Sequence, residues 1–226
     1  MTEAPVITID GPSGSGKGTV SQKLATDLGW HYLDSGAIYR ALAYAAELAG
    51  IEGSAGKEQI VSLARELKLK FSPADDGGAG VLLAGTDISD SIRTEECGAM
   101  ASKLAADGEI RAALLQRQRD FRQPPGLVAD GRDMGTVVFP DATHKFFLTA
   151  SAQVRAERRY KQLKEKGIND SISRLFTVIS ERDARDAGRS NSPLTPATDA
   201  IVLDTSDMSL DEVIGFVKQH VGYQSL

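Results

Sequence analysis

The chain has 226 residues, 41% of them hydrophobic, and a formal net charge of −5. This length and composition fit one α/β domain covering residues 1–226, and the acidic balance argues against a nucleic-acid partner. The sequence shows no signal-peptide pattern, no apolar run of about 18 residues as a membrane span needs, and a single cysteine, Cys97. We therefore expect a cytoplasmic protein without a membrane segment or disulfides.

A glycine-rich string lies between a strand pattern and a helix pattern. Val6–Ile9 is a short apolar run typical of a buried parallel strand, and the helix pattern that follows ends at Gly29. Strand, glycine loop and helix together predict a phosphate-binding loop, in which backbone N–H groups and Lys17 hold a nucleoside triphosphate. The residues of this loop are Gly11, Pro12, Ser13, Gly14, Ser15, Gly16, Lys17, Gly18 and Thr19.

One position of the loop departs from the common pattern. The Ser or Thr expected directly after the lysine is Gly18, so the hydroxyl that usually holds magnesium has either moved to Thr19 or is absent.

A second anion site is predicted shortly after the loop. Trp30–Leu33 reads as a strand, and Asp34 begins a helix that ends near Gly50. The first turn of this helix presents Ser35 and Arg40, and a helix N-terminus beside an arginine can bind an anion. Arg40 as a solvated surface residue is the alternative.

Residues 51–123 read as an insertion between two core strands. The pattern predicts helices at Lys57–Glu66, Thr94–Lys103 and Glu109–Arg122, a strand at Leu67–Phe71, and a hairpin of Val81–Leu83 with Ile88 across Gly85. Asp76–Gly80 is predicted to form a loop tip.

The core resumes at Gly126–Asp130, an apolar run that ends in an acid. Such an acid commonly orders magnesium and its waters in phosphate-loop proteins. Arg132 follows between Asp130 and Asp133, where it either recognises a ligand or forms a structural ion pair. Two more strands, His144–Leu148 and Ala200–Asp204, and a final helix starting at Ser209 complete the core.

Twelve of the fifteen arginines lie between Arg111 and Arg189. One helix pattern carries Arg155, Arg158 and Arg159 and breaks at Gly167. The next helix has an inward-facing stripe formed by Ile172, Leu175, Phe176 and Ile179. That stripe continues onto Arg182, Asp186 and Arg189, which either pair with one another or overhang an anion-filled cleft.

These features together predict phosphoryl transfer between two bound phosphates. The loop binds a nucleoside triphosphate, the region of Arg40 and Arg132 binds the second anion, and the arginine-rich segment closes over both. The transferred charge is spread over several oxygens, so lysine, arginine and magnesium stabilise it and no covalent residue is needed. Closure with both ligands bound also limits hydrolysis by water.

Four strings resemble those of bacterial cytidylate kinases, which are nucleoside monophosphate kinases: Gly11–Thr19, Asp34–Arg40, Asp130–Asp141 and Ser192–Leu194. The resemblance covers essentially the whole chain. It implies transfer of the γ-phosphoryl group of ATP to CMP or dCMP with Mg²⁺, on an α/β phosphate-loop fold with a five-stranded parallel core sheet flanked by helices. It also implies an inserted nucleoside-monophosphate-binding subdomain at about residues 51–123 and a helical lid at about 153–190. We expect small-molecule substrates as the only partners, and a monomer.

The resemblance also implies roles for individual residues. It implies that the phosphate side of the acceptor is held by Ser35, Arg40, Arg132 and Arg189. It implies that the cytosine is read by Ser102, Arg111 and Asp133, and the ribose approached by Arg182 and Asp186. It implies that the lid covers ATP with Arg155, Arg158 and Arg159, and that the catalytic groups are Lys17, Arg132, Arg158 and Arg159. Gly18 is normal in this family, so Asp130 is expected to hold magnesium through water.

Other functions remain open at this level. A kinase for UMP or another nucleoside monophosphate could use a similar site, although the exocyclic amino group of cytosine favours an acceptor such as Asp133. A nucleotide-binding switch protein specific for guanine would need an Asn-Lys-x-Asp string, which the sequence lacks. A nucleic-acid-dependent ATPase fits poorly with the acidic balance.

Overall fold

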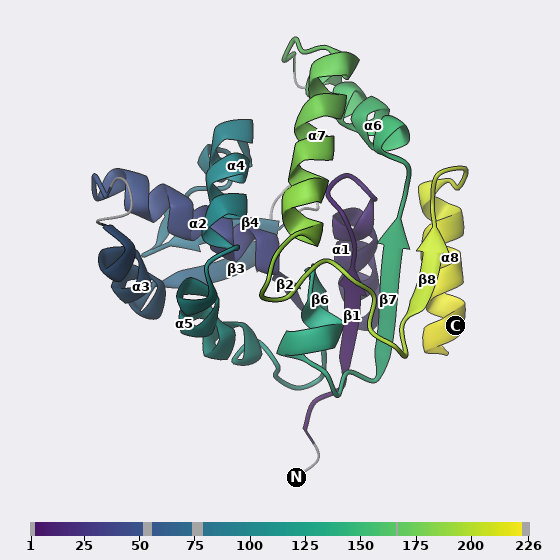
Figure 1. Ribbon diagram of the computed structural model, residues 1–226. Helices are drawn as coiled ribbons and strands as arrows, with labels where there is room; N and C mark the ends of the chain where they lie inside the picture. Colours follow the sequence, from purple (N-terminus) through teal and green to yellow (C-terminus); the bar gives the residue numbers. More distant parts are fainter. Residues whose placement is uncertain (1–2, 52–55, 74–78, 166, 223–226) are drawn as a thin grey trace.

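The computed structural model describes residues 3–51, 56–73, 79–165 and 167–222. Its described residues form a central parallel sheet of five strands in the order β2-β6-β1-β7-β8 (Figure 1). These strands are β1 (Val6–Asp10), β2 (His31–Asp34), β6 (Leu127–Gly131), β7 (His144–Thr149) and β8 (Ile201–Asp204). The middle strand, β1, is buried along all five residues. The predicted five-stranded parallel core is therefore confirmed.

The two faces of the sheet are covered by different helices. Ile7 and Ile9 pack in one cluster with apolar residues of α1 (Lys17–Leu28) and α8 (Leu210–Val221). Val6 belongs to the other, larger cluster, which includes α2 (Ser35–Leu48). Since side chains alternate along a strand, Thr8 and Asp10 lie on the same side of β1 as Val6.

Three of the predicted helix ends agree with the structure. Asp34 caps α2 by accepting a 2.9 Å hydrogen bond from the backbone N–H of Ala37. Gly29 ends α1 in the left-handed conformation, with a φ of 64°. Ser209 and Glu212 form the capping box that begins α8. These caps fix where the sheet-to-helix connections turn, and therefore where the loops at the carboxyl ends of the strands lie.

The insertion contains a small antiparallel sheet and three helices beside the main sheet (Figure 1). Its elements are α3 (Lys57–Glu66), β3 (Leu69–Pro73), β4 (Ala79–Leu83), β5 (Thr86–Asp87), a short helical turn at Ser91–Arg93, α4 (Glu95–Leu104) and α5 (Gly108–Arg119). The hairpin across Gly85 is confirmed. The predicted loop tip is only partly testable, because residues 76–78 lie outside the described residues. Ala79 and Gly80 belong to β4, since backbone pairing with Pro73 and Ser72 reaches that far.

The arginine-rich segment forms a pair of packed helices, α6 (Ala152–Glu165) and α7 (Ile172–Ala187), above the sheet in Figure 1. Leu175 and Ile179 are buried against α6, as the stripe predicts. The prediction for Phe176 was wrong, because its side chain is 40% exposed. The apolar cluster of α7 is shared with α6 alone, so this helix buries a narrower stripe than the sequence pattern suggests.

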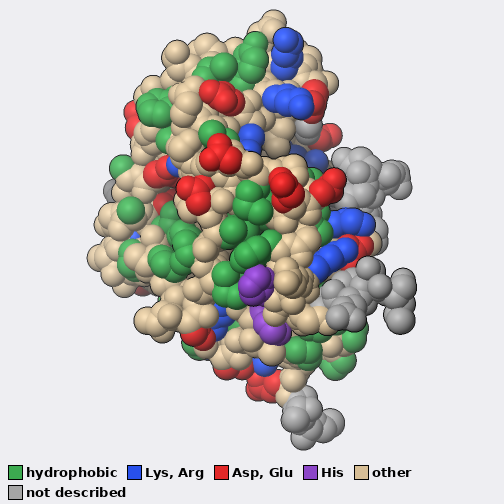
Figure 2. Space-filling model, turned by 90° about the vertical axis from the view of Figure 1, so that its right-hand side faces the viewer, with side chains coloured by type: hydrophobic (Ala, Val, Ile, Leu, Met, Phe, Trp, Pro, Cys, Tyr) green, Lys and Arg blue, Asp and Glu red, His purple; other side chains and the backbone are tan. Residues whose placement is uncertain are grey.

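Other differences concern the ends of elements and one turn. The strand β3 begins at Leu69 rather than Leu67, β8 begins at Ile201 rather than Ala200, and α5 ends at Arg119 rather than Arg122. Both β2 and β6 start one residue later than predicted, because their pairing begins with His31 opposite Leu127. The sequence also gave no sign of the helical turn Met134–Val138 after β6. On the face turned to the viewer in Figure 2, acidic, basic and apolar side chains are interspersed. Across the described residues, no helix combines the length and apolar character that crossing a membrane requires.

Candidate functional site

Residues 11–16 form a loop between the carboxyl end of β1 and the start of α1. Gly11 has a φ of 148°, and a Cβ atom there would lie 2.0 Å from the carbonyl oxygen of Leu148, so only glycine fits. No side chain among the described residues caps the first turn of α1 at Gly16, so its N–H groups can bind an anion. Lys17 Nζ donates a 3.1 Å hydrogen bond to the carbonyl of Pro12 and braces the loop.

The position of Asp130 explains why Gly18, rather than Ser or Thr, follows Lys17. This buried carboxylate belongs to the penultimate residue of β6, and its Oδ1 lies 3.9 Å from Lys17 Nζ. A Cβ atom on Gly18 would lie 3.2 Å from Oδ2 of Asp130, which is a tight contact, so a larger residue would press on the carboxylate. Thr19, the other candidate for the missing hydroxyl, is exposed. The structure therefore places an acid, rather than a hydroxyl, beside the lysine.

Burial sets the charge states of this pair. It raises the pKa of Asp130 to about 7 although Lys17 attracts the carboxylate, and it lowers the pKa of Lys17 to about 8. Repulsion from Arg132 and Arg182 lowers the pKa of Lys17 further. The phosphate loop, Arg132 after β6 and Arg182 of α7 thus share one electrostatic environment, and an anion bound between them relieves their repulsion.

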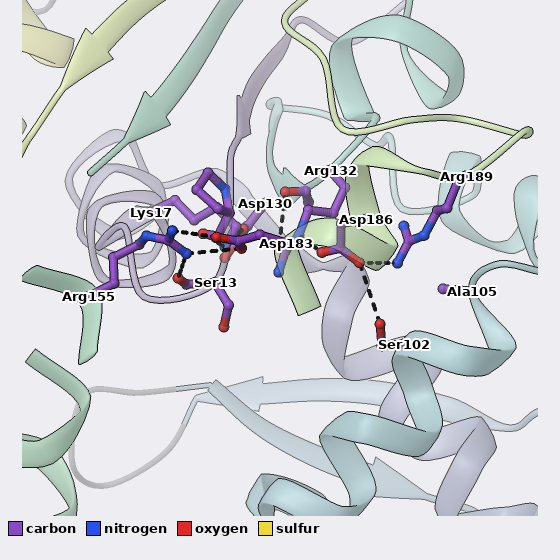
Figure 3. A network of polar contacts seen from close by, with 12 residues as sticks. Ser13, Lys17, Ser102, Ala105, Asp130, Arg132, Arg155, Asp183, Asp186 and Arg189 are labelled. Carbon is purple, nitrogen blue, oxygen red and sulfur yellow. Dashed lines mark hydrogen bonds and ion pairs between the residues drawn. The ribbon is translucent and has the colours of Figure 1, made fainter. Parts of the chain in front are cut away.

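Next to the loop, three basic or polar side chains converge on Asp186 of α7 (Figure 3). Arg132 Nε donates a 2.9 Å hydrogen bond to Oδ2, Arg189 pairs with Oδ1, and Ser102 Oγ lies 3.4 Å from Oδ1. Asp186 itself is 1% exposed. Burial acts to raise its pKa, but Arg132, Arg189 and Arg182 outweigh burial and hold the pKa below its usual value. Asp186 is therefore an ionised carboxylate shared between arginines.

Positive charge exceeds negative charge in this cluster. Arg182 lies near Asp186, yet its Nε has no hydrogen-bond partner among the described residues. Burial lowers the pKa of Arg182 to about 9, and repulsion from Arg132 and Arg40 adds to the effect. The pairing expected as one alternative is confirmed, and because these residues also line a cavity, the anion-filled cleft stays a prediction. Three guanidinium groups around one carboxylate favour a further anion.

Two cavities flank the pair formed by Arg111 and Asp133. The arginine cavity, of about 40 Å³, is lined by Ser35, Gly36, Tyr39, Ala101, Ser102, Ala105, Arg111, Gly131, Arg132, Asp133, Arg182, Asp186 and Arg189. The Asn191 cavity, of about 180 Å³, is lined by Gly108, Arg111, Ala112, Leu115, Gln118, Asp133, Val137, Val138, Asn191 and Ser192. Arg111 and Asp133, which form a salt bridge, line both. Eight of the nine residues that the sequence assigned to the acceptor therefore lie around one cavity.

Arg40 is the ninth residue of that set; it lies close enough to Arg182 to lower the pKa of that guanidinium, but it does not line the cavity. Its Nη1 donates hydrogen bonds to the carbonyls of Ile92 (2.8 Å) and Thr94 (3.0 Å), which hold α4 against α2. Burial lowers its pKa. It is not among the residues that line the arginine cavity. Ser35 does line the cavity, and its hydroxyl donates a 2.7 Å hydrogen bond to Gln118.

Each predicted lid arginine is held by protein groups. Arg155 pairs with Asp183 and donates a 3.1 Å hydrogen bond to the carbonyl of Ser13 in the phosphate loop (Figure 3). Arg158 donates to Thr205, in the loop after β8, with 3.1 Å between Nη1 and Oγ1. Arg159 pairs with Glu95 at the start of α4, with 3.0 Å between Nε and Oε1. The helix α6, which carries these arginines, thus contacts the phosphate loop, the loop after β8 and the insertion.

The family model and the similar curated proteins point to the same family. The family model described as cytidylate kinase matches residues 7–222. The chain belongs to the cytidylate kinase family. It is 58% identical over 212 residues to a cytidylate kinase of Nitrosococcus oceani (93% of each chain) and 59% identical over 210 residues to one of Methylococcus capsulatus (93% of each chain). The resemblance predicted from the four sequence strings is confirmed.

A solved structure supports the fold alone. An uncharacterized protein from Eubacterium ventriosum superposes with a TM-score of 0.50 at 11% identity, covering 98% of this chain and 100% of the other. At that identity the likeness says nothing about substrates.

Sequence reasoning missed several residues around the site. Gln118 is buried on α5 and holds Ser35, and Asp183 and Glu95 hold lid arginines. Asp10 was also missed. The signal that could have found it is the one that found Asp130, an acid directly after a short, mainly apolar strand pattern.

Proposed function

We propose that this chain transfers the γ-phosphoryl group of ATP to CMP or dCMP, giving ADP and CDP or dCDP. Family membership supports the reaction. The observation that carries it in the structure is the cluster of Arg132, Arg182 and Arg189 around the one carboxylate of Asp186, directly beside the phosphate loop. Two phosphate-bearing ligands can therefore be held side by side, because the phosphate loop and the arginine cluster are separate sets of binding groups.

On the donor side, we assign ATP to the loop Gly11–Thr19. Backbone N–H groups at the start of α1 face the phosphates, and Lys17 supplies the charge. The Asp130 carboxylate lies beside Lys17 and Gly18, and an oxygen ligand of this kind fits Mg²⁺, which usually keeps several waters and binds substrate phosphates. Magnesium, when bound, neutralises charge on the phosphate oxygens.

On the acceptor side, we assign the phosphate of CMP to the arginine cavity. Arg132 and Arg189 replace part of their contact with Asp186 by contact with the phosphate, and Arg182 gains the partner that it lacks. The cavity of about 40 Å³ is much smaller than the few hundred Å³ of a typical ligand pocket, so the insertion or lid must open first. Parting Arg111 from Asp133 joins the two cavities and makes room for the base.

Base selection follows from hydrogen-bonding capacity. The carboxylate of Asp133 accepts hydrogen bonds, which suits the amino group of cytosine, whereas uracil presents a carbonyl oxygen at the same position. A buried carboxylate facing a carbonyl is left unpaired, and such mismatches discriminate strongly. We therefore propose that Asp133 favours CMP and dCMP over UMP.

During transfer, the lid arginines exchange protein partners for phosphate oxygens. Arg155 is already hydrogen-bonded to the phosphate loop, and Arg159 leaves Glu95 to reach the donor. The guanidinium groups and Lys17 then stabilise the charge that develops on the moving group. We further propose that the enzyme is a cytoplasmic monomer, and its single cysteine, Cys97, fits a reducing compartment.

An ADP-release assay tests this function directly. Purified protein is mixed with ATP and, in separate reactions, with CMP, dCMP, UMP, AMP or no acceptor. We expect release with CMP and dCMP and much less with the other three. Release that does not depend on the acceptor contradicts the proposal, and a preference for UMP contradicts the role of Asp133. Sedimentation in the same buffer tests the monomer.

A further inference from the structure

The helical turn Met134–Val138 begins directly after Asp133. The N–H of Phe139, which follows the turn, donates a 2.7 Å hydrogen bond to the carbonyl of Met134. The two residues are farther apart in the sequence than hydrogen-bonded residues of an α-helix, and such turns are frequent at functional sites. A short acidic residue immediately before a helical turn normally caps its exposed N–H groups. Asp133 occupies that position, but its side chain makes no capping hydrogen bond. It pairs with Arg111 and lines both cavities instead.

The carboxylate that caps this turn comes from far away in the sequence. Asp10, the last residue of β1, accepts a 2.9 Å hydrogen bond from the N–H of Met134 at Oδ1 and a 2.8 Å hydrogen bond from the N–H of Gly135 at Oδ2. Asp10 is buried and directly precedes Gly11 of the phosphate loop. Burial raises its pKa to about 6, although the two N–H donors act in the opposite direction.

We propose that Asp10 is a positioning residue for the phosphoryl acceptor: by capping the 134–138 turn in place of Asp133, it leaves the Asp133 carboxylate free to face the base. The inference rests on the proposed acceptor role of Asp133. Two buried N–H groups need an acceptor, and without Asp10 the carboxylate that directly precedes the turn in the sequence is that of Asp133. Asp133 cannot cap the turn and also face the cavity. The side chain of Asp10, directly before the phosphate loop, thus positions Asp133 in the proposed acceptor site.

The inference predicts an effect on one ligand only. Asp10→Asn keeps the shape of the side chain but turns an N–H₂ donor toward one of the two N–H groups. We expect CMP affinity, measured by calorimetry, to fall about tenfold, which corresponds to one lost charge-assisted hydrogen bond. ATP affinity, measured without an acceptor, is expected to change less than about twofold, because the hydrogen bonds of the Asp10 side chain go to Met134 and Gly135 and not to the phosphate loop.

A double-mutant cycle tests whether Asp10 acts through Asp133. We expect Asp133→Asn alone to weaken CMP, and Asp10→Asn to add little in its presence, because residues that act as a unit are not additive. The matched control is Thr8→Val. Thr8 is fully buried two residues earlier on the same side of β1, and its hydroxyl has no hydrogen-bond partner among the described residues, so CMP affinity should not change.

The outcomes separate the inference from the function on which it rests. Unchanged CMP affinity in Asp10→Asn, equal weakening of CMP and ATP, or effects that multiply with those of Asp133→Asn overturn the inference. An Asp133→Asn variant that binds CMP normally overturns the proposed acceptor role instead. If Asp10→Asn does not give a cooperative thermal transition, Asp10→Ser, which keeps one acceptor oxygen, is tested against the same criteria.

Discussion

Asp186→Asn tests whether the carboxylate at the centre of the arginine cluster is needed for stability. The wild-type side chain is 1% exposed and accepts hydrogen bonds from Arg132 and Arg189. Each charge-assisted bond contributes about 1.5 to 3 kcal/mol, and the single carbonyl of asparagine keeps one acceptor. Breaking a buried ion pair by removing one partner costs about 3 to 5 kcal/mol. We therefore expect the free energy of unfolding to fall by about 3 kcal/mol, a large part of the about 5 to 15 kcal/mol that a domain has.

Urea unfolding followed by circular dichroism measures this loss, provided that the slope with urea concentration stays constant. Glu109→Gln is the control, because Glu109 pairs with Lys57 at an exposed position where its side chain is 69% exposed. Such surface pairs contribute about 0.2 to 1 kcal/mol. Inorganic phosphate should stabilise Asp186→Asn more than the wild type, because it supplies the missing negative charge. A loss no larger than that of Glu109→Gln refutes the reasoning.

The pH dependence of the stability difference between wild type and Asp186→Asn can be derived from the pKa of Asp186. Because the arginines hold the pKa of Asp186 below its ordinary value of 3.8, the carboxylate contributes stability at all pH values above 3.8. That contribution is lost only as the pH falls below 3.8 and through the lower pKa of the folded state. The stability gap between wild type and Asp186→Asn should therefore be constant between neutral pH and about pH 5.

Three further predictions concern the phosphate loop and the lid. Lys17→Ala and Arg132→Ala should each lower kcat by at least about a hundredfold, because each removes a group that stabilises the charge of the transition state. Neither should change the melting temperature enough to explain that loss. A variant that unfolds while its folded fraction keeps normal activity contradicts this prediction. ATP binding at pH 8 should take up protons, because the pKa of Lys17 is lowered to about 8 in the free enzyme and the phosphates restore its charge. Calorimetry in two buffers of different ionisation enthalpy detects the uptake, which should vanish in Lys17→Arg. Glu95→Gln should lower the KM for ATP, because Arg159 then reaches ATP without breaking its ion pair with Glu95. The effect should be at most about fivefold, because that pair is partly exposed and contributes little to the free energy. A raised KM shows instead that the pair supports the lid.

Much of the scaffold could be predicted because it depends on local patterns. The buried run Val6–Ile9, the cap at Asp34 and the capping box at Ser209 each follow from residues within a few positions of one another. The phosphate loop is local in part, since the turn itself requires the positive φ of Gly14 and Gly16. Motifs of this kind place the carboxyl ends of the strands, and therefore the region of the site, without knowledge of tertiary contacts.

The remaining features depend on contacts between distant segments. The hydrogen bonds of Asp10 reach residues 134 and 135, and those of Ser35 reach Gln118, so no local pattern announces them. The stripe on α7 predicted a buried Phe176, but burial depends on how many partners a helix has, and its cluster includes only α6. Arg40 illustrates the same point: the motif places it at a helix start, whereas the carbonyls of Ile92 and Thr94 decide where it points.

Calorimetric titration of ATP and of CMP into Lys17→Ala and Asp133→Asn tests the two-ligand site most directly. The geometry predicts that Lys17→Ala weakens ATP by at least about tenfold and CMP by less than about threefold, and that Asp133→Asn does the reverse. Both variants should keep a cooperative thermal transition. Weakening of the same ligand by both variants, or of both ligands equally by either one, contradicts a site divided between the phosphate loop and the arginine cavity.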